Sequence, residues 1–214
     1  MVVSVNGRHS ILQPDGGYLK STSVTPSLTD VMLTIAGNTP VSQPFNTDYA
    51  DALHILDRIL DSRREPGIGW KASGFTFNDI DSFNRSSRYV IFSHPLFEIL
   101  NSPPTNISKY RDRYNVWTTA GWPMSTSQAT NEQREIVSNE SHIVRPLPLA
   151  TFIDSPKDYH ALLAGNLAVI TFTVKHWIDR SHRVDIFHAE IVTIDPILPL
   201  PPSPDDMLRR LLAI

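Results

Sequence analysis

The residues best suited to chemistry lie at the end of a predicted β-hairpin near the C-terminus. His176, Asp179, His182 and Asp185 follow one another there. Two imidazoles and a carboxylate can hold a divalent metal or transfer protons when neighbouring strands bring them together. A cross-strand His–Asp pair at a hairpin rim is also common without catalysis. A small hydrolase-type enzyme that uses His176, His182 and Asp185 is therefore our alternative hypothesis for function.

A second group of residues interleaves cations with aromatic rings in the middle of the chain. Rings stack on bases while Lys and Arg follow phosphates, so this composition is typical of a groove for single-stranded nucleic acid. The opposing interpretation makes Trp117 and Trp122 core anchors, because tryptophan buries a large apolar area. The predicted ligand-binding residues are Arg85, Arg88, Tyr110, Arg111, Arg113, Tyr114, Trp117 and Trp122, together with Thr173, Lys175 and His188 from one face of the hairpin.

No catalytic or cofactor motif is found elsewhere in the sequence. The nucleophile elbow Gly-x-Ser-x-Gly, the P-loop, the His-Glu-x-x-His zinc motif and the dinucleotide-binding Gly-x-Gly-x-x-Gly are all absent. The chain has no cysteine, which excludes a disulfide framework, thiol catalysis and thiolate metal ligands. We therefore favour a protein that is not an enzyme and that carries no cofactor or metal.

Composition and charge limit the classes of partner. The hydrophobic fraction of 41% and the charged fraction of 19% are typical of a globular chain. The net charge of −3 gives no global attraction for nucleic acid, although residues 83–183 are mildly basic, with 11 Lys and Arg against 8 Asp and Glu. No apolar run reaches the roughly 20 residues that span a bilayer, and no secretory signal is evident. We expect an intracellular protein, cytoplasmic or nuclear, with no membrane contact.

The elements that would position these residues are mostly short strands. One long helix is predicted over 48–63, capped by Asn46 or Thr47, because its apolar residues recur at helical spacing. Residues 157–163 form a second, shorter helix that ends at Gly165. Residues 125–140 are polar throughout and are expected to be a long exposed connection, and 95–100 is expected to be a helical turn or two. The remaining strands are expected at 2–5, 18–24, 31–36, 70–77, 88–92, 114–122 and, as an extended edge, 143–153.

The C-terminal hairpin is the most distinct local pattern. Two β-rich runs, 167–178 and 183–194, surround a polar turn at 179–182. With a four-residue loop, Ile178 faces Arg183 and His176 faces Asp185. One face of the hairpin is then almost wholly apolar and is expected to pack on a core, while the other is mixed and faces solvent or a ligand.

These patterns together predict an α+β fold dominated by β structure. We expect a curved antiparallel sheet that closes toward a barrel or sandwich, with one main amphipathic helix packed across it. The order of strands, helix and closing hairpin is compatible, at the level of architecture only, with a barrel of the oligonucleotide-binding (OB) type. We expect residues 1–195 to form a single domain, followed over 196–214 by a proline-rich linker and a short amphipathic helix.

The functional hypothesis from the sequence is a non-enzymatic binding or adaptor domain. Its expected partner is another protein or a single-stranded nucleic acid, met by the basic and aromatic residues named above. A homo-oligomer formed through the C-terminal helix is a further expectation. A self-assembling, coat-like structural subunit is the third alternative, beside the His/Asp enzyme.

Overall fold

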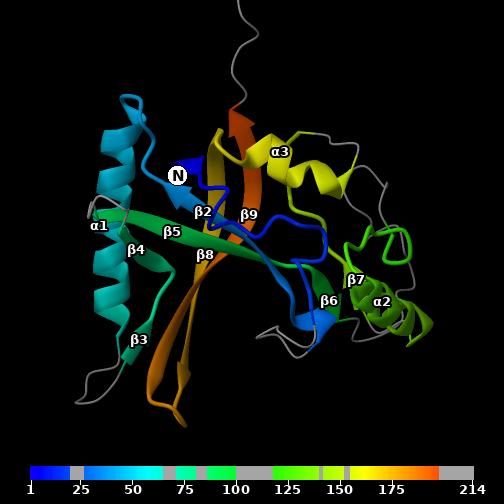
Figure 1. Ribbon diagram of the computed structural model, residues 1–214. Helices are drawn as coiled ribbons and strands as arrows, with labels where there is room; N and C mark the ends of the chain where they lie inside the picture. The colour runs from blue at the N-terminus through cyan, green and yellow to red at the C-terminus, as the bar shows by residue number, and fades with distance from the viewer. Residues whose placement is uncertain are drawn as a thin grey trace, which may run out of the picture.

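Five strands of the computed structural model close into a ring of backbone hydrogen bonds (Figure 1). The structure describes residues 1–19, 27–64, 71–80, 86–99, 118–139, 142–151 and 155–197. Around the ring, each strand pairs with the next and β8 pairs again with β1. In ring order the strands are β1 (Val2–Val5), β2 (Met32–Asn38), β5 (Ser86–Pro95), β9 (Val184–Ile197) and β8 (Leu167–Asp179).

The order of the ring strands identifies the barrel type. If the ring strands are numbered by their order along the chain, their order around the ring is one, two, three, five, four. Strands three and five, which are β5 and β9, run parallel. The other ring pairs are antiparallel. This is the arrangement of the OB fold, a five-stranded Greek-key barrel. The prediction of a β-dominated, curved sheet closing toward a barrel is therefore confirmed.

Alternation along the ring strands fills the barrel. Val3, Leu33, Ile35, Val90 and Phe92 are fully buried, and each belongs to the apolar half of an alternating pattern. The barrel is narrow where β1, β2 and β5 meet. A Cβ atom at Gly37 would lie 2.8 Å from Val3 Cγ1 and 3.0 Å from Phe92 Cε2, so only glycine fits there.

Two short strands extend the barrel sheet, and two more form a separate pair. β3 (Lys71–Ser73) runs parallel to β9, and β4 (Thr76–Ile80) runs antiparallel to β5. The predicted strand 70–77 is thus two strands divided at Gly74. β6 (Phe97–Ile99) pairs with β7 (His142–Val144), so the helical turn predicted at 95–100 is wrong. Pairing with a distant segment decides the conformation of residues 97–99, and local sequence does not encode it.

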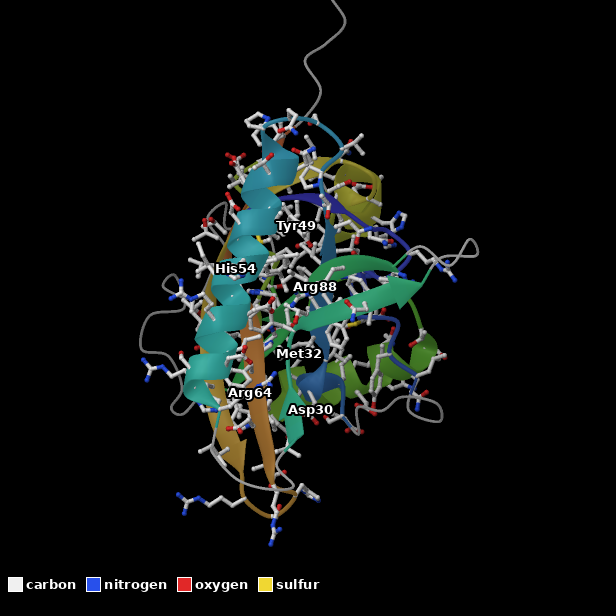
Figure 2. All side chains as sticks on the ribbon, turned by 90° about the vertical axis from the view of Figure 1, so that its left-hand side faces the viewer. Asp30, Met32, Tyr49, His54, Arg64 and Arg88 are labelled. Carbon is white, nitrogen blue, oxygen red and sulfur yellow. The ribbon has the colours of Figure 1, made fainter. Side chains whose placement is uncertain are left out.

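The main helix, α1, covers residues Phe45–Arg63 and lies along one side of the barrel (Figures 1 and 2). It packs with Tyr49, Leu53, Leu56 and Leu60, as its spacing predicts. It begins earlier than expected, because the first turn closes on the carbonyl oxygen of Pro44, which accepts from the N–H groups of Thr47 and Asp48. The predicted caps, Asn46 and Thr47, therefore lie inside the helix.

The predicted exposed connection over 125–140 is also wrong, because most of it is helix α2 (Ser127–Asn139), on the opposite side of the barrel from α1 (Figure 1). Its buried residues are Ala129, Gln133 and Ile136. Gln133 donates from Nε2 to the carbonyl oxygens of Thr119 and Trp122, at 2.6 and 2.8 Å. A buried face that contains glutamine and alanine does not register as apolar periodicity.

The short helix before the hairpin agrees with its prediction. A 3₁₀ turn, Pro156–Asp158, leads into α3 (Tyr159–Leu163), and Gly165 follows with a φ of +80°. The strand predicted at 18–24 is not formed at residues 18 and 19, and none is formed at residues 118–122 of the strand predicted at 114–122. The other residues of these two strands lie outside the described part of the chain, as does everything after Ile197.

The predicted hairpin is present as β8 and β9, with a register shifted by two residues between the turn and Phe172 and by three beyond the irregularity at Thr171/Phe172. His176 faces Phe187 rather than Asp185, and Ile178 faces Asp185 rather than Arg183. The turn occupies residues 180–183, one residue later than expected, and Arg183 closes it with a φ of 54°. A shift of two keeps the side chains between the turn and Phe172 on their own faces, so the apolar face still packs on the core.

Candidate nucleic-acid interface

Three aromatic rings lie side by side on the outside of the barrel. The His9 and Tyr89 rings stack with centroids 5.2 Å apart and planes 10° apart. Tyr89 also stacks on Phe77, with centroids 5.7 Å apart and planes 24° apart. Phe77 at the end of this series is 43% exposed, although it is a large apolar side chain. We call His9, Tyr89 and Phe77 the ring row.

The sheet places two of the three rings. Tyr89 on β5 is directly opposite Phe77 on β4, and opposite Asn38 on β2. Because alternate residues of a strand face opposite sides, the full burial of Val90 in the core puts the neighbouring Tyr89 on the outer surface.

The third ring comes from the segment that follows β1, residues 6–19, which we call the β1–β2 segment. The Asn6 side-chain oxygen accepts from the N–H groups of Arg8 and His9, which forms the turn. Ser10 Oγ donates to the Asn6 carbonyl oxygen at 2.6 Å and accepts from the Ala36 N–H at 2.9 Å. These hydrogen bonds hold His9 beside β2 and β5, where its ring meets Tyr89.

The position of the ring row agrees with the general use of this barrel type. OB folds bind oligonucleotides and oligosaccharides on the face of their second and third strands and with the loops between strands one and two and between strands four and five, the last of which is the β8–β9 turn in this chain. Tyr89 belongs to the third ring strand, β5, and His9 to the segment between the first two. Phe77 extends the same surface onto β4.

The hairpin provides a second polar and aromatic surface. Trp177 is 47% exposed, and its ring meets the His188 ring edge-on at 6.2 Å. Arg180 and Arg183 are exposed in the turn. Figure 1 shows that this end of β8 and β9 projects beyond the barrel, away from α3.

The predicted hairpin ligands Thr173, Lys175 and His188 lie around an ion-pair cluster. Thr173 is exposed and directly opposite Glu190. Lys175 forms an ion pair with Glu190, which also lies 4.0 Å from Arg145. Burial raises the pKa of Glu190, but Lys175, Arg145 and His188 together leave it below its ordinary value. Burial, together with Lys175, lowers the pKa of His188. The charge of Lys175 is thus already compensated within the protein.

Two of the predicted ligand residues are positioned for structure instead. Trp122 is 2% exposed, and its Nε1 donates to the Pro14 carbonyl oxygen at 2.7 Å, so the prediction of Trp122 as a ligand is wrong and the core interpretation is right. Arg88 donates from both terminal nitrogens to the Asp57 carboxylate on α1, one distance being 2.6 Å, and lies beside that helix in Figure 2. Hydrogen bonding from Arg88 lowers the pKa of Asp57. The Arg88 guanidinium is therefore engaged in holding α1.

The His/Asp residues of the alternative enzyme form two separate pairs. His176 Nε2 lies 2.9 Å from Asp185 Oδ1, with the imidazole stacked on Phe187. His182 Nδ1 lies instead 2.7 Å from Asp179 Oδ2, within the turn. Hydrogen bonds from Ser181 and His182 lower the pKa of Asp179. Within the described ranges, no group of three His, Asp or Glu side chains is placed to hold a metal ion.

Six predicted ligand residues lie outside the described part of the chain: Arg85, Tyr110, Arg111, Arg113, Tyr114 and Trp117. Sequence reasoning did not single out His9 and Phe77, the two ends of the ring row. The only sequence signal for Phe77 was its position in a predicted strand, next to the polar residue Asn78. That position does not indicate which rings Phe77 contacts.

No protein-family model matches the chain, and no curated protein matches it. One solved structure is similar: the crystal structure of gp2.5, a single-stranded DNA-binding protein encoded by bacteriophage T7, at 8% identity and a TM-score of 0.42, over 96% of this chain and 93% of that one. A similarity at this level assigns no function. Among the described helices, none is long and apolar enough to cross a bilayer.

Proposed function

We propose that this protein binds single-stranded nucleic acid on the ring row and is a binding protein rather than an enzyme. The observation that carries the proposal is the stacking of three rings from three separate segments, with Phe77 exposed at one end. Each base has a flat π-face, and stacking on an aromatic side chain contributes about 1–3 kcal/mol per base.

The ligand is single-stranded because the exposed ring of Phe77, at the end of the row, offers a face for stacking, whereas Tyr89 lies between its two neighbours. In a duplex each base is covered by its neighbours, whereas the bases of a single strand can turn out onto a protein surface. The net charge of −3 also argues against binding driven mainly by phosphate contacts. We therefore expect a modest dependence on salt and little preference for sequence.

Fluorescence anisotropy with a labelled oligonucleotide tests the proposal. We expect an oligothymidine of about 16 nucleotides, the upper end of the site size of one OB fold, to bind more tightly than a duplex of the same length. Equal or tighter binding of the duplex would contradict the proposal, as would flat traces for both at low salt.

A protein partner is the second candidate, and Trp177 is the observation that favours it. This exposed tryptophan and the adjoining Arg180 lie on the projecting hairpin, and both residue types are enriched where binding energy concentrates in protein interfaces. Trp177→Ala should leave the affinity for the oligonucleotide unchanged if the ring row is the nucleic-acid site. A loss as large as that caused by removing Tyr89 would place the hairpin in the nucleic-acid site instead.

A further inference from the structure

A basic cleft is lined in part by the β1–β2 segment, which also carries His9 of the ring row. It has a volume of about 680 Å³ and is bounded by that segment, by the residues before α2 and by the start of α3. Arg8, Lys157 and His160 line it, together with the polar side chains of Ser10, Gln13 and Ser125. No carboxylate is among the lining residues.

The positive charge of the cleft is not compensated by the described part of the chain. Arg8 and Lys157 are exposed, and neither forms an ion pair with a described residue. This distinguishes them from Arg88 and Lys175, whose charges are paired with Asp57 and Glu190. A site with an arginine, a lysine and an imidazole and no lining acid favours an anion.

The walls of the cleft are held in place by packing. A Cβ atom at Gly7 would lie 2.8 Å from Ala164 Cβ and 3.2 Å from His160 Nε2, so the β1–β2 segment lies directly against the end of α3. Behind the opposite wall, the fully buried carboxylate of Asp15, which is not itself a lining group, accepts from the N–H of Ser125 at 2.7 Å and of Gly17 at 3.0 Å. The cations are therefore presented from a fixed frame.

The cleft is continuous with the ring row through consecutive residues. Arg8 and Ser10 line the cleft, and His9 between them stacks on Tyr89. We propose that the cleft binds phosphate groups of the same strand whose bases stack on the ring row, so that the strand crosses the β1–β2 segment at His9. This inference rests on the proposed function and extends the bound surface from β4 to α3.

The dependence of affinity on salt tests the inference. Each phosphate contact contributes about 0.7 to the slope of log K against log salt for a single strand. We expect Arg8→Gln and Lys157→Gln each to lower the slope by about that amount and to weaken binding most at low salt. Arg58→Gln removes the same charge from the exposed face of α1 and serves as the matched control, with an unchanged slope.

The outcomes separate this inference from the proposed function. Both cleft variants could bind the oligonucleotide with the same salt slope as the unsubstituted protein. That result would overturn the proposal that the cleft binds phosphate groups and would leave the proposed function standing. A complete absence of oligonucleotide binding would overturn both. Titration with thymidine monophosphate tests the other source of the same anion: if the free mononucleotide binds as tightly as the strand, and binding depends on Lys157, the cleft is a nucleotide pocket and the proposed path is wrong.

Discussion

Replacing Tyr89 by leucine removes the centre of the ring row while keeping a large apolar side chain. Tyr89 contacts both other rings, at centroid distances of 5.2 and 5.7 Å, so its loss separates His9 from Phe77. The exposed Phe77 ring then loses the ring that supports it, so the base stacked on Phe77 loses a fixed platform, which corresponds to about 1–3 kcal/mol or roughly a 5- to 150-fold weaker affinity. Since no charge changes, the slope of affinity against salt should stay the same.

The assay is oligonucleotide anisotropy, accompanied by urea unfolding of each variant. Two ring contacts are lost, at about 0.5–1.5 kcal/mol each, so Tyr89→Leu should also unfold at a lower urea concentration. Tyr89→Phe is the matched control, because it keeps the ring and removes only the hydroxyl group. We expect it to bind as the unsubstituted protein does.

Two results would refute this reasoning. A folded Tyr89→Leu protein with unchanged affinity would show that bases do not stack on the row. An equal loss in Tyr89→Phe would assign the effect to the hydroxyl group instead of the ring.

Three further predictions concern the structure around the site. Burial and the nearby Arg145 lower the pKa of His94 to about 4. As the pH falls below about 6.5, the imidazole is therefore protonated in the unfolded chain before it is protonated in the folded one, and roughly 3 kcal/mol of unfolding free energy should be lost by pH 4. In His94→Leu, the unfolding free energy from urea unfolding, monitored by circular dichroism, should lose most of this pH dependence, and an unchanged dependence would contradict the assignment. Arg88→Met should lower the unfolding free energy by about 1 kcal/mol or less and leave the affinity for the oligonucleotide unchanged, because the guanidinium group is hydrogen-bonded to Asp57 on α1. A large loss of affinity would instead show that Arg88 belongs to the binding surface. Trp122→Ala should cost about 3–5 kcal/mol in the same unfolding assay, whereas a small cost would argue that the ring is not a core anchor.

The parts of the fold that the sequence predicts are those encoded locally. Helix α1 and the hairpin follow from apolar periodicity, and the buried faces of β8 and β9 are correct although the register is not. The register depended on the turn, where Asp179 accepts from the N–H groups of Ser181 and His182 and Arg183 takes a left-handed conformation. Neither feature is a strong signal in a sequence without glycine or proline at the turn.

The candidate site was largely beyond sequence reasoning for a topological reason. His9, Phe77 and Tyr89 come from three segments, and only the closed barrel brings them together. Clustering along the sequence instead emphasised Arg88 and Trp122, which the fold uses to hold α1 and to fill the core. Neighbours in sequence therefore drew attention to two residues that the fold uses for structure, while Tyr89, next to Arg88, lies at the centre of the ring row.

The most direct test of the central claim is to map where a bound strand touches the protein. Ultraviolet crosslinking of the full chain to oligothymidine, followed by mass spectrometry of the crosslinked peptides, locates bases that lie against side chains. We predict crosslinks at Tyr89 and Phe77, with His9 on the third crosslinked peptide. Crosslinks confined to the hairpin around Trp177, with none on the ring row, would contradict the account.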